Sequence, residues 1–257
     1  MRLGRLRIVV ALAAAATVAG GTAEAAGGGP SGPVEASAAA TAPRVQVTVV
    51  GQTRTLLAPK SVIARARTVS VGRRHCAIAA GTALAGLEAA RRAGGPSYRL
   101  RDYGTCSRRA GDAASLFVLQ IGSERNRGSD GWVYKIARRV PTAGAADPAG
   151  HRLRRGERLT WFYCRMQRRG GCQRTLELSV PGRAAPGAPL RAVVRGYDDE
   201  GRGTPVAGAT VTLAAVTGVT GPDGTATLIA PAAAGRYRAM AERPGLVPAF
   251  PAEVRVG

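Results

Sequence analysis

Aromatic residues are scarce in this sequence: three Phe, two Trp and six Tyr account for 4% of its 257 residues. The hydrophobic fraction is 45%, but much of it is alanine, which contributes little buried area. A chain of this length has material for two domains, each with a small core. Small cores depend more than large ones on covalent cross-links, so the cysteines become important.

Histidine is also scarce, and only His75 and His151 are present. His75 adjoins Cys76, but a cysteine of an exported chain is usually bridged rather than nucleophilic. The acidic run at 198–200 lacks the spaced oxygen ligands of a calcium loop. No glycine-rich stretch is followed by the Lys-Ser/Thr pair of a phosphate-binding loop. We therefore predict a protein that is not an enzyme, with no metal site and no cofactor.

Long apolar runs are missing, apart from a short one near the start. Residues 1–26 are typical of a secretory signal peptide: arginines precede an apolar run at 8–19, and Ala23-Glu24-Ala25 fits a cleavage site. No later segment approaches the length of a membrane span. Residues 27–43, rich in Gly, Ala, Ser and Pro, predict an unstructured spacer. We expect a protein without a transmembrane segment that is secreted or associated with the cell envelope.

Four cysteines, an even number in an exported chain, favour two disulfides. Of the three possible pairings we favour Cys76 with Cys106 and Cys164 with Cys172. The second pair flanks Arg168-Arg169-Gly170-Gly171, a turn between two strand-like runs that would bring the sulfurs together. Zinc is the alternative, but neither pair has the short separation of a zinc knuckle.

Acidic residues number 16 against 37 Lys plus Arg, and the net charge is +21. Arginine pairs begin at positions 73, 91, 108, 138, 154 and 168. A basic surface of this kind can hold a protein on anionic wall polymers or lipid headgroups by a salt-sensitive attraction. The alternative is a solvated surface produced by codon drift in a GC-rich genome. Export and the absence of a nucleic-acid module argue against specific nucleic-acid binding.

The first domain is predicted over residues 44–180. Val45, Val47 and Val49 alternate with polar residues, as in a half-buried strand. Residues 77–93 are the most convincing helix, with Thr82 available as its cap. The continuous apolar run at 116–121 predicts a central strand that is covered on both faces and forms the spine of the domain.

Most of the aromatic area lies in two predicted strands at 131–136 and 157–164. Strand alternation places Trp132 with Tyr134, and Trp161 with Tyr163, on one face each. Core packing explains this concentration, because aromatic side chains dominate core energetics. A ligand platform is the alternative, and its candidate binding residues are Trp132, Tyr134, Trp161 and Tyr163.

The second domain is predicted over residues 181–257, after a linker rich in Pro, Gly and Ala at 181–189. Asp223-Gly224 is a strong hairpin signal. Short strand candidates without any helix pattern indicate a small β-sandwich. These strands are expected at 190–195, 209–213, 225–229 and 237–241.

Three features of residues 44–180 carry a resemblance to a known family: the helix after Gly81-Thr82, the strand Gly131-Trp132-Val133-Tyr134, and the run from Leu153 to Trp161. The segment resembles bacterial families similar to the C-terminal β-domain of transcobalamin and intrinsic factor. That resemblance implies a β-grasp-like fold. It also implies capture of a corrinoid together with a separate α-helical barrel protein.

The second domain resembles bacterial immunoglobulin-like and carboxypeptidase-regulatory-like modules, through residues 203–211, 220–226 and 235–237. Such modules act as spacers, adhesion units and display stalks. The expected fold class is an α+β β-grasp-like domain with one main helix, followed by an all-β immunoglobulin-like sandwich. The expected function is an exported, non-catalytic binding or adhesion protein whose basic first domain engages an anionic cell-envelope component or a protein partner. Corrinoid capture is the alternative.

Overall fold

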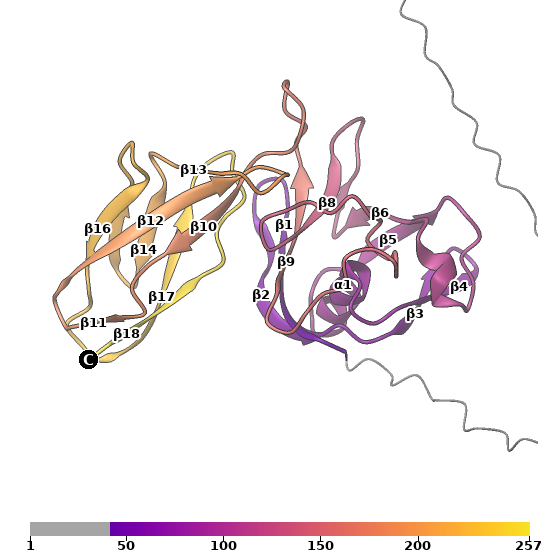
Figure 1. The fold of residues 1–257 in the computed structure, drawn as a ribbon, viewed down its shortest axis with the longest axis horizontal. Coiled ribbons are helices and arrows are strands. Elements are labelled where there is room, and N and C mark those ends of the chain that lie inside the picture. Colours follow the sequence, from indigo (N-terminus) through magenta and orange to yellow (C-terminus); the bar gives the residue numbers. More distant parts are fainter. Residues whose placement is uncertain (1–41) are drawn as a thin grey trace, which may run out of the picture. The chain divides into compact units, whose positions relative to one another are not determined.

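The computed structural model describes residues 42–257 (Figure 1). The predicted signal peptide at 1–26 lies outside the described residues, as does the predicted spacer up to residue 41. Residues 42–257 lie within one compact unit. Its buried apolar side chains form two main clusters. We call the parts built around these clusters the first module (42–174) and the second module (175–257).

A four-stranded central sheet organises the first module, in the order β2-β1-β9-β8. The pairing of β1 with β9 is parallel, whereas β1 with β2 and β8 with β9 are antiparallel. In β9 every residue after Arg158 is buried. The sheet is therefore covered on both faces. Its strands are β1 (Arg44–Val50), β2 (Thr55–Ile63), β8 (Gly131–Ile136) and β9 (Arg158–Cys164).

Helix α1 (Ala83–Arg92) covers one face of this sheet. The Thr82 hydroxyl caps it by accepting a hydrogen bond from the Ala85 amide at 3.2 Å, as predicted. The helix is shorter than the predicted 77–93, because Ala77 pairs within a β-ladder instead. The helix also lies very close to β9: a Cβ added to Gly86 would stand 2.6 Å from a methyl carbon of Leu159.

Two small sheets complete the helix side of the core. One pairs β3 (Arg67–Val71) with β4 (Arg74–Ile78), and the other has the order β5-β6-β7. The predicted spine at 116–121 is β6, but the prediction that it is covered on both faces is wrong: Phe117 is 44% exposed. The interior strands of the central sheet are instead β1 and β9. The second small sheet and the short 3-10 turn beside it comprise β5 (Tyr98–Asp102), Ala110–Ala113, β6 (Leu116–Ile121) and β7 (Glu124–Arg125).

A buried carboxylate ties the helix to the second small sheet. Glu88 of α1 is 3% exposed at its side chain and accepts hydrogen bonds from Arg91, Arg92 and Tyr98. Burial of the Glu88 carboxyl opposes its ionisation, but these three donors outweigh that effect and lower its pKa to about 2. The Glu88 cluster is therefore a charged element of an otherwise apolar layer.

The second module consists of two sheets that share one core. β10 pairs with β12, so this core begins at residue 175 rather than after residue 180, where the predicted domain boundary lies. All four predicted strands of this part are present, and two of them, β12 and β17, are longer than predicted. One sheet contains β10 (Thr175–Ser179), β12 (Pro189–Tyr197), β13 (Gly203–Pro205) and β16 (Thr225–Ile229). The other contains β11 (Arg183–Ala184), β14 (Thr210–Leu213), β15 (Val216–Val219), β17 (Gly235–Glu242) and β18 (Ala252–Val256).

The predicted fold class, an α+β β-grasp-like domain followed by an immunoglobulin-like sandwich, is wrong. The structure is 47% strand and 6% helix, with one α-helix in the described residues, and fits an all-β protein better. The physical reason lies in the first core. Side chains of β3, β4 and β6 share the helix side of that core with α1, so strands do much of the packing that the prediction assigned to a helix.

We predict that Glu88→Gln lowers the free energy of unfolding by about 2 kcal/mol at pH 7, because it weakens four charge-assisted hydrogen bonds from three residues. The folded-state pKa lies below the ordinary value of 4.5, so the stabilisation is present above about pH 4.5 and is lost as the pH falls toward 2. Urea unfolding at several pH values measures this difference, with the exposed Glu253→Gln as control. An equal deficit at pH 2 and pH 7 would contradict the interpretation.

Candidate anion-binding surface

The four aromatic residues proposed as ligand contacts are brought together in two pairs across β8 and β9. Trp132 lies opposite Tyr163 with ring centroids 5.6 Å apart, and Tyr134 lies opposite Trp161 at 5.2 Å. Their exposures are only 4%, 2%, 9% and 1%, respectively. All four belong to the first core, where they offer no accessible ring to a corrinoid or another ligand.

Three of these side chains also hold surface segments in place. The Trp132 indole donates to the Glu124 carbonyl at 2.8 Å, the Tyr134 hydroxyl to the Ala143 carbonyl at 2.7 Å, and the Tyr163 hydroxyl to the Arg125 carbonyl at 3.0 Å. Burial raises the pKa of Tyr134 to about 12, so its hydroxyl remains a donor at neutral pH. The contacts are those of core residues that anchor loops.

Both predicted disulfides are formed, Cys76–Cys106 and Cys164–Cys172, and no described cysteine is free. The thiol of Cys76 is thus unavailable as a nucleophile beside His75. No helix of residues 42–257 is long and apolar enough to cross a membrane. In the same residues, no group of three or more His, Cys, Asp or Glu side chains is arranged to hold a metal. These features are compatible with an extracellular protein.

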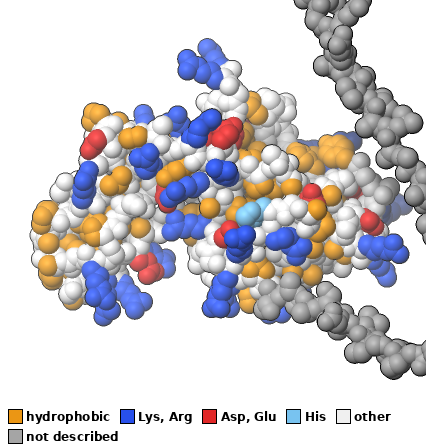
Figure 2. Space-filling view, viewed as in Figure 1, with side chains coloured by type: hydrophobic (Ala, Val, Ile, Leu, Met, Phe, Trp, Pro, Cys, Tyr) orange, Lys and Arg blue, Asp and Glu red, His pale blue; other side chains and the backbone are white. Residues whose placement is uncertain are grey.

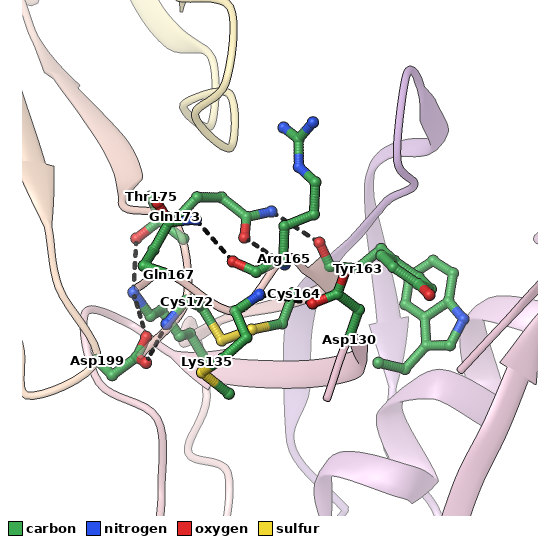
Figure 3. The surroundings of a disulfide bond; sticks show 12 residues. Asp130, Lys135, Tyr163, Cys164, Arg165, Gln167, Cys172, Gln173, Thr175 and Asp199 are labelled. Atoms are coloured by element: carbon green, nitrogen blue, oxygen red, sulfur yellow. Dashed lines mark hydrogen bonds and ion pairs between the residues drawn. A yellow bond between two sulfur atoms is a disulfide. The ribbon is translucent and has the colours of Figure 1, made fainter. Parts of the chain in front are cut away.

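Lys135, a residue that the sequence did not single out, is fully buried next to the Cys164–Cys172 bridge (Figure 3). Its ammonium donates to the carbonyls of Tyr197 at 3.0 Å and Asp198 at 2.9 Å and lies 3.3 Å from an Asp199 carboxylate oxygen. The second Asp199 carboxylate oxygen accepts a hydrogen bond from the Cys172 amide at 2.8 Å. One lysine of the first module is therefore held by a loop of the second.

This buried cation is structural in character. Burial lowers the pKa of Lys135, and the Asp199 carboxylate opposes that shift. The acidic run at 198–200 is used within the protein: Asp199 faces Lys135, while Asp198 and Glu200 both pair with Arg202 at 2.8 and 2.9 Å. These acidic side chains therefore make contacts within the protein, between the two modules and inside the 198–202 turn.

Basic side chains are widely spread, so charge alone does not define a site. Figure 2 shows Lys and Arg side chains over much of the visible face and fewer Asp and Glu side chains among them. A second feature is needed to single out one region, and exposed aromatic rings provide it. Tyr103 is 63% exposed and Phe117 44% exposed, and their ring centroids are 6.0 Å apart.

These rings share one region of the first module with exposed arginines. The Arg101 guanidinium lies 4.7 Å from the centre of the Tyr103 ring, and Arg99 occupies the same face of β5 as Arg101. In the β5–β6 ladder, Arg101 is the direct partner of Phe117. We call Arg99, Arg101, Tyr103 and Phe117 the basic aromatic surface.

A disulfide joins two segments that each carry an exposed arginine pair, and an ion pair between Arg74 and Asp102 holds one of these segments against β5. Arg73-Arg74 precedes Cys76, and Arg108-Arg109 follows Cys106; all four arginines are exposed. The Ala77 amide also donates to the Ser107 carbonyl at 2.8 Å, so both segments are held in register. Two segments with exposed arginine pairs, more than thirty residues apart in the sequence, are therefore linked covalently.

The two carboxylates of this region leave most of the positive charge unbalanced. Asp102 is buried at its side chain and pairs with Arg74 at 2.9 Å. Hydrogen bonds from the Ser115 hydroxyl and from the Cys106 and Gly104 amides, together with Arg74, hold the pKa of Asp102 below its ordinary value. Asp112 accepts from the Ser107 hydroxyl. A surface with this excess of guanidinium groups suits an anionic partner.

No protein-family model matches this chain, and no curated protein matches it. The resemblances inferred from the sequence therefore remain hypotheses about its relatives. The sequence carried a partial signal for the basic aromatic surface: Arg99, Arg101 and Tyr103 alternate along one run. The exposure of Phe117 was not predictable from its apolar run, because it depends on which layer covers β6.

We predict that Lys135→Met lowers the free energy of unfolding by about 3 to 5 kcal/mol, because it leaves two carbonyls and the Asp199 carboxylate without their cation. Chemical denaturation measures the effect. The other lysine offers a matched control: Lys60 is exposed, and Lys60→Met should change stability by less than about 1 kcal/mol. If Lys135→Met lost no more stability than Lys60→Met, the buried ammonium would be dispensable.

Removing a disulfide should have a local as well as a global effect. Cys76→Ala with Cys106→Ala opens a separation of 30 residues and should cost about 3.5 kcal/mol, whereas Cys164→Ala with Cys172→Ala opens a separation of 8 and should cost about 2.5 kcal/mol. Hydrogen exchange at residues 103–115 should become faster in the first double variant only. Equal exchange rates in both variants would contradict a role for the first bridge in holding residues 103–115 in place.

Proposed function

We propose that this chain is an exported, non-catalytic binding protein of the cell envelope. Its first module binds an anionic envelope component through the basic aromatic surface, and its second module acts as a spacer. The observation that carries the proposal is the juxtaposition of two exposed arginines, Arg99 and Arg101, with two exposed aromatic rings on β5, β6 and the loop after β5. Four more exposed arginines belong to the two segments joined by the Cys76–Cys106 bridge, namely Arg73, Arg74, Arg108 and Arg109.

The type of side chain supports an anionic partner. A guanidinium remains charged at all physiological pH values and presents several donors in one plane, which suits carboxylate, sulfate or phosphate oxygens. In this region only Arg74 has an ion-pair partner among the described residues. The remaining guanidinium groups can each accept an external anion without breaking an internal salt bridge.

The connection between modules supports the spacer role. The second module contacts the other face of the central sheet through Lys135 and through a cluster of Phe162, Val50 and Val247. The basic aromatic surface belongs to β5, β6 and the loop after β5, which take no part in these contacts. The second module can therefore project from the first without occupying the binding surface.

The proposal predicts retention on isolated cell envelopes that is strong at low salt and lost near 1 M salt, where the screening length falls to about 3 Å. A variant that replaces Arg99, Arg101, Arg108 and Arg109 with Gln should bind envelopes at least about tenfold more weakly. Sedimentation of the protein with envelope fragments over a salt series measures both effects.

A matched variant separates a local site from general charge. Gln substitutions at Arg183, Arg191, Arg236 and Arg255, all exposed in the second module, remove the same charge. They should leave retention within about twofold of the unmodified protein. Equal losses in both variants would refute a specific surface, and retention that survives 1 M salt would refute the electrostatic mechanism.

A further inference from the structure

We propose that the anionic component is a lipid bilayer, with the Tyr103 and Phe117 rings entering the headgroup region and the surrounding arginines contacting lipid phosphates. The inference rests on the proposed function and specifies its partner. It is carried by a juxtaposition: an exposed aromatic pair whose ring centroids are 6.0 Å apart lies among exposed guanidinium groups on one strand face.

Exposed aromatic pairs are unusual in this protein. Of the three aromatic ring pairs in residues 42–257, the two formed by β8 and β9 are buried in the core, and the Tyr103–Phe117 pair is at the surface. Aromatic residues account for only 4% of the chain. Leaving two of them in water, in contact with each other, sacrifices apolar burial that a folded chain normally uses.

The chemistry of the rings favours a bilayer over a soluble polyanion. A hydrophilic polymer of phosphate or carboxylate groups would use the arginines, but Phe117 has no polar atom to offer it. A bilayer interface uses both kinds of side chain, since aromatic rings partition into the headgroup region and arginines are attracted to anionic lipids. Tyr103 suits this location because its hydroxyl can remain hydrated.

The arginines are placed to support insertion of the rings. Arg101 covers the Tyr103 ring at 4.7 Å, and a guanidinium stacked on a ring keeps its in-plane donors free for phosphate oxygens. Arg99 extends the same strand face. Arg74 adds positive charge next to this strand, where it pairs with Asp102 of β5. Charge complementarity with an anionic leaflet and apolar contact therefore come from the same region.

The test compares binding to three partners: vesicles of phosphatidylcholine containing phosphatidylglycerol, vesicles of phosphatidylcholine alone, and soluble dextran sulfate. We expect the full chain to bind the anionic vesicles and not the neutral ones. Tyr103→Ser with Phe117→Ser should weaken binding to anionic vesicles at least about tenfold and leave binding to dextran sulfate within about twofold. Arg99→Gln with Arg101→Gln should weaken binding to both anionic partners by about fivefold per arginine.

The control for lost apolar surface is Val219→Ser with Ile229→Ser, two side chains that are 67% and 50% exposed in the second module. This variant should bind anionic vesicles like the unmodified protein. Binding to dextran sulfate without binding to anionic vesicles would overturn the bilayer proposal and leave the proposed function intact. Failure to bind either anionic partner would overturn both.

A spectroscopic measurement keeps the proposal testable if the serine variant does not fold. In Tyr103→Trp the new indole should shift its emission to the blue on anionic vesicles and be quenched by brominated lipids. The native Trp132 and Trp161 are only 4% and 1% exposed, so they provide a background that does not respond. An unshifted and unquenched emission from vesicle-bound protein would show that the ring stays outside the bilayer.

Discussion

The arrangement of this protein depends on one strand that is buried on both faces. Leu159, Trp161 and Tyr163 of β9 point into the core beneath α1, whereas Phe162 and Cys164 belong to a separate cluster with Val247 of the second module. A strand of this kind needs two covering layers, because either face left in water would expose large apolar side chains. The helix side supplies one layer, and the second module supplies the other.

The contact between the central sheet and the second module is fixed by a buried charge as well as by apolar packing. Hydrophobic packing alone tolerates small shifts, since it has little directionality. The buried Lys135 ammonium requires residues 197–199 to lie where two of their carbonyls and the Asp199 carboxylate can contact it. The Asp199 carboxylate also accepts a hydrogen bond from the Cys172 amide, so the disulfide loop belongs to the same network. A misplaced loop would leave a charge unpaired in the interior, which is strongly destabilising.

Features that depend on nearby residues were predictable from the sequence. The Thr82 cap and the turn between Cys164 and Cys172 each depend on a short segment, and the structure contains both. Val45, Val47 and Val49 of β1 are buried as predicted, but Thr48 and Val50 are buried too, so the strand is not half-buried. The Cys76–Cys106 bridge was also predicted.

Features that depend on distant partners were not predictable in the same way. A continuous apolar run such as 116–121 is compatible with a fully covered strand and with one that has a free face, and only the neighbouring layers decide between them. The same applies to residues 175–179, which were assigned to the first domain but pair with β12 of the second module as β10. Lys135 gave no signal because a lysine within an aromatic strand indicates an exposed position unless its partners are known.

The location of the basic aromatic surface follows from these constraints. Neither face of the central sheet is open to solvent, because one side packs against the first core and the other against the second module. A surface able to bind a large partner must then lie on a peripheral sheet that retains a solvent face. The β5–β6 pair is such a sheet: Val118 points into the core while Arg101 and Phe117 point outward. Because β9 is buried on both faces where the modules join, a binding surface of the first module must lie on its peripheral sheets.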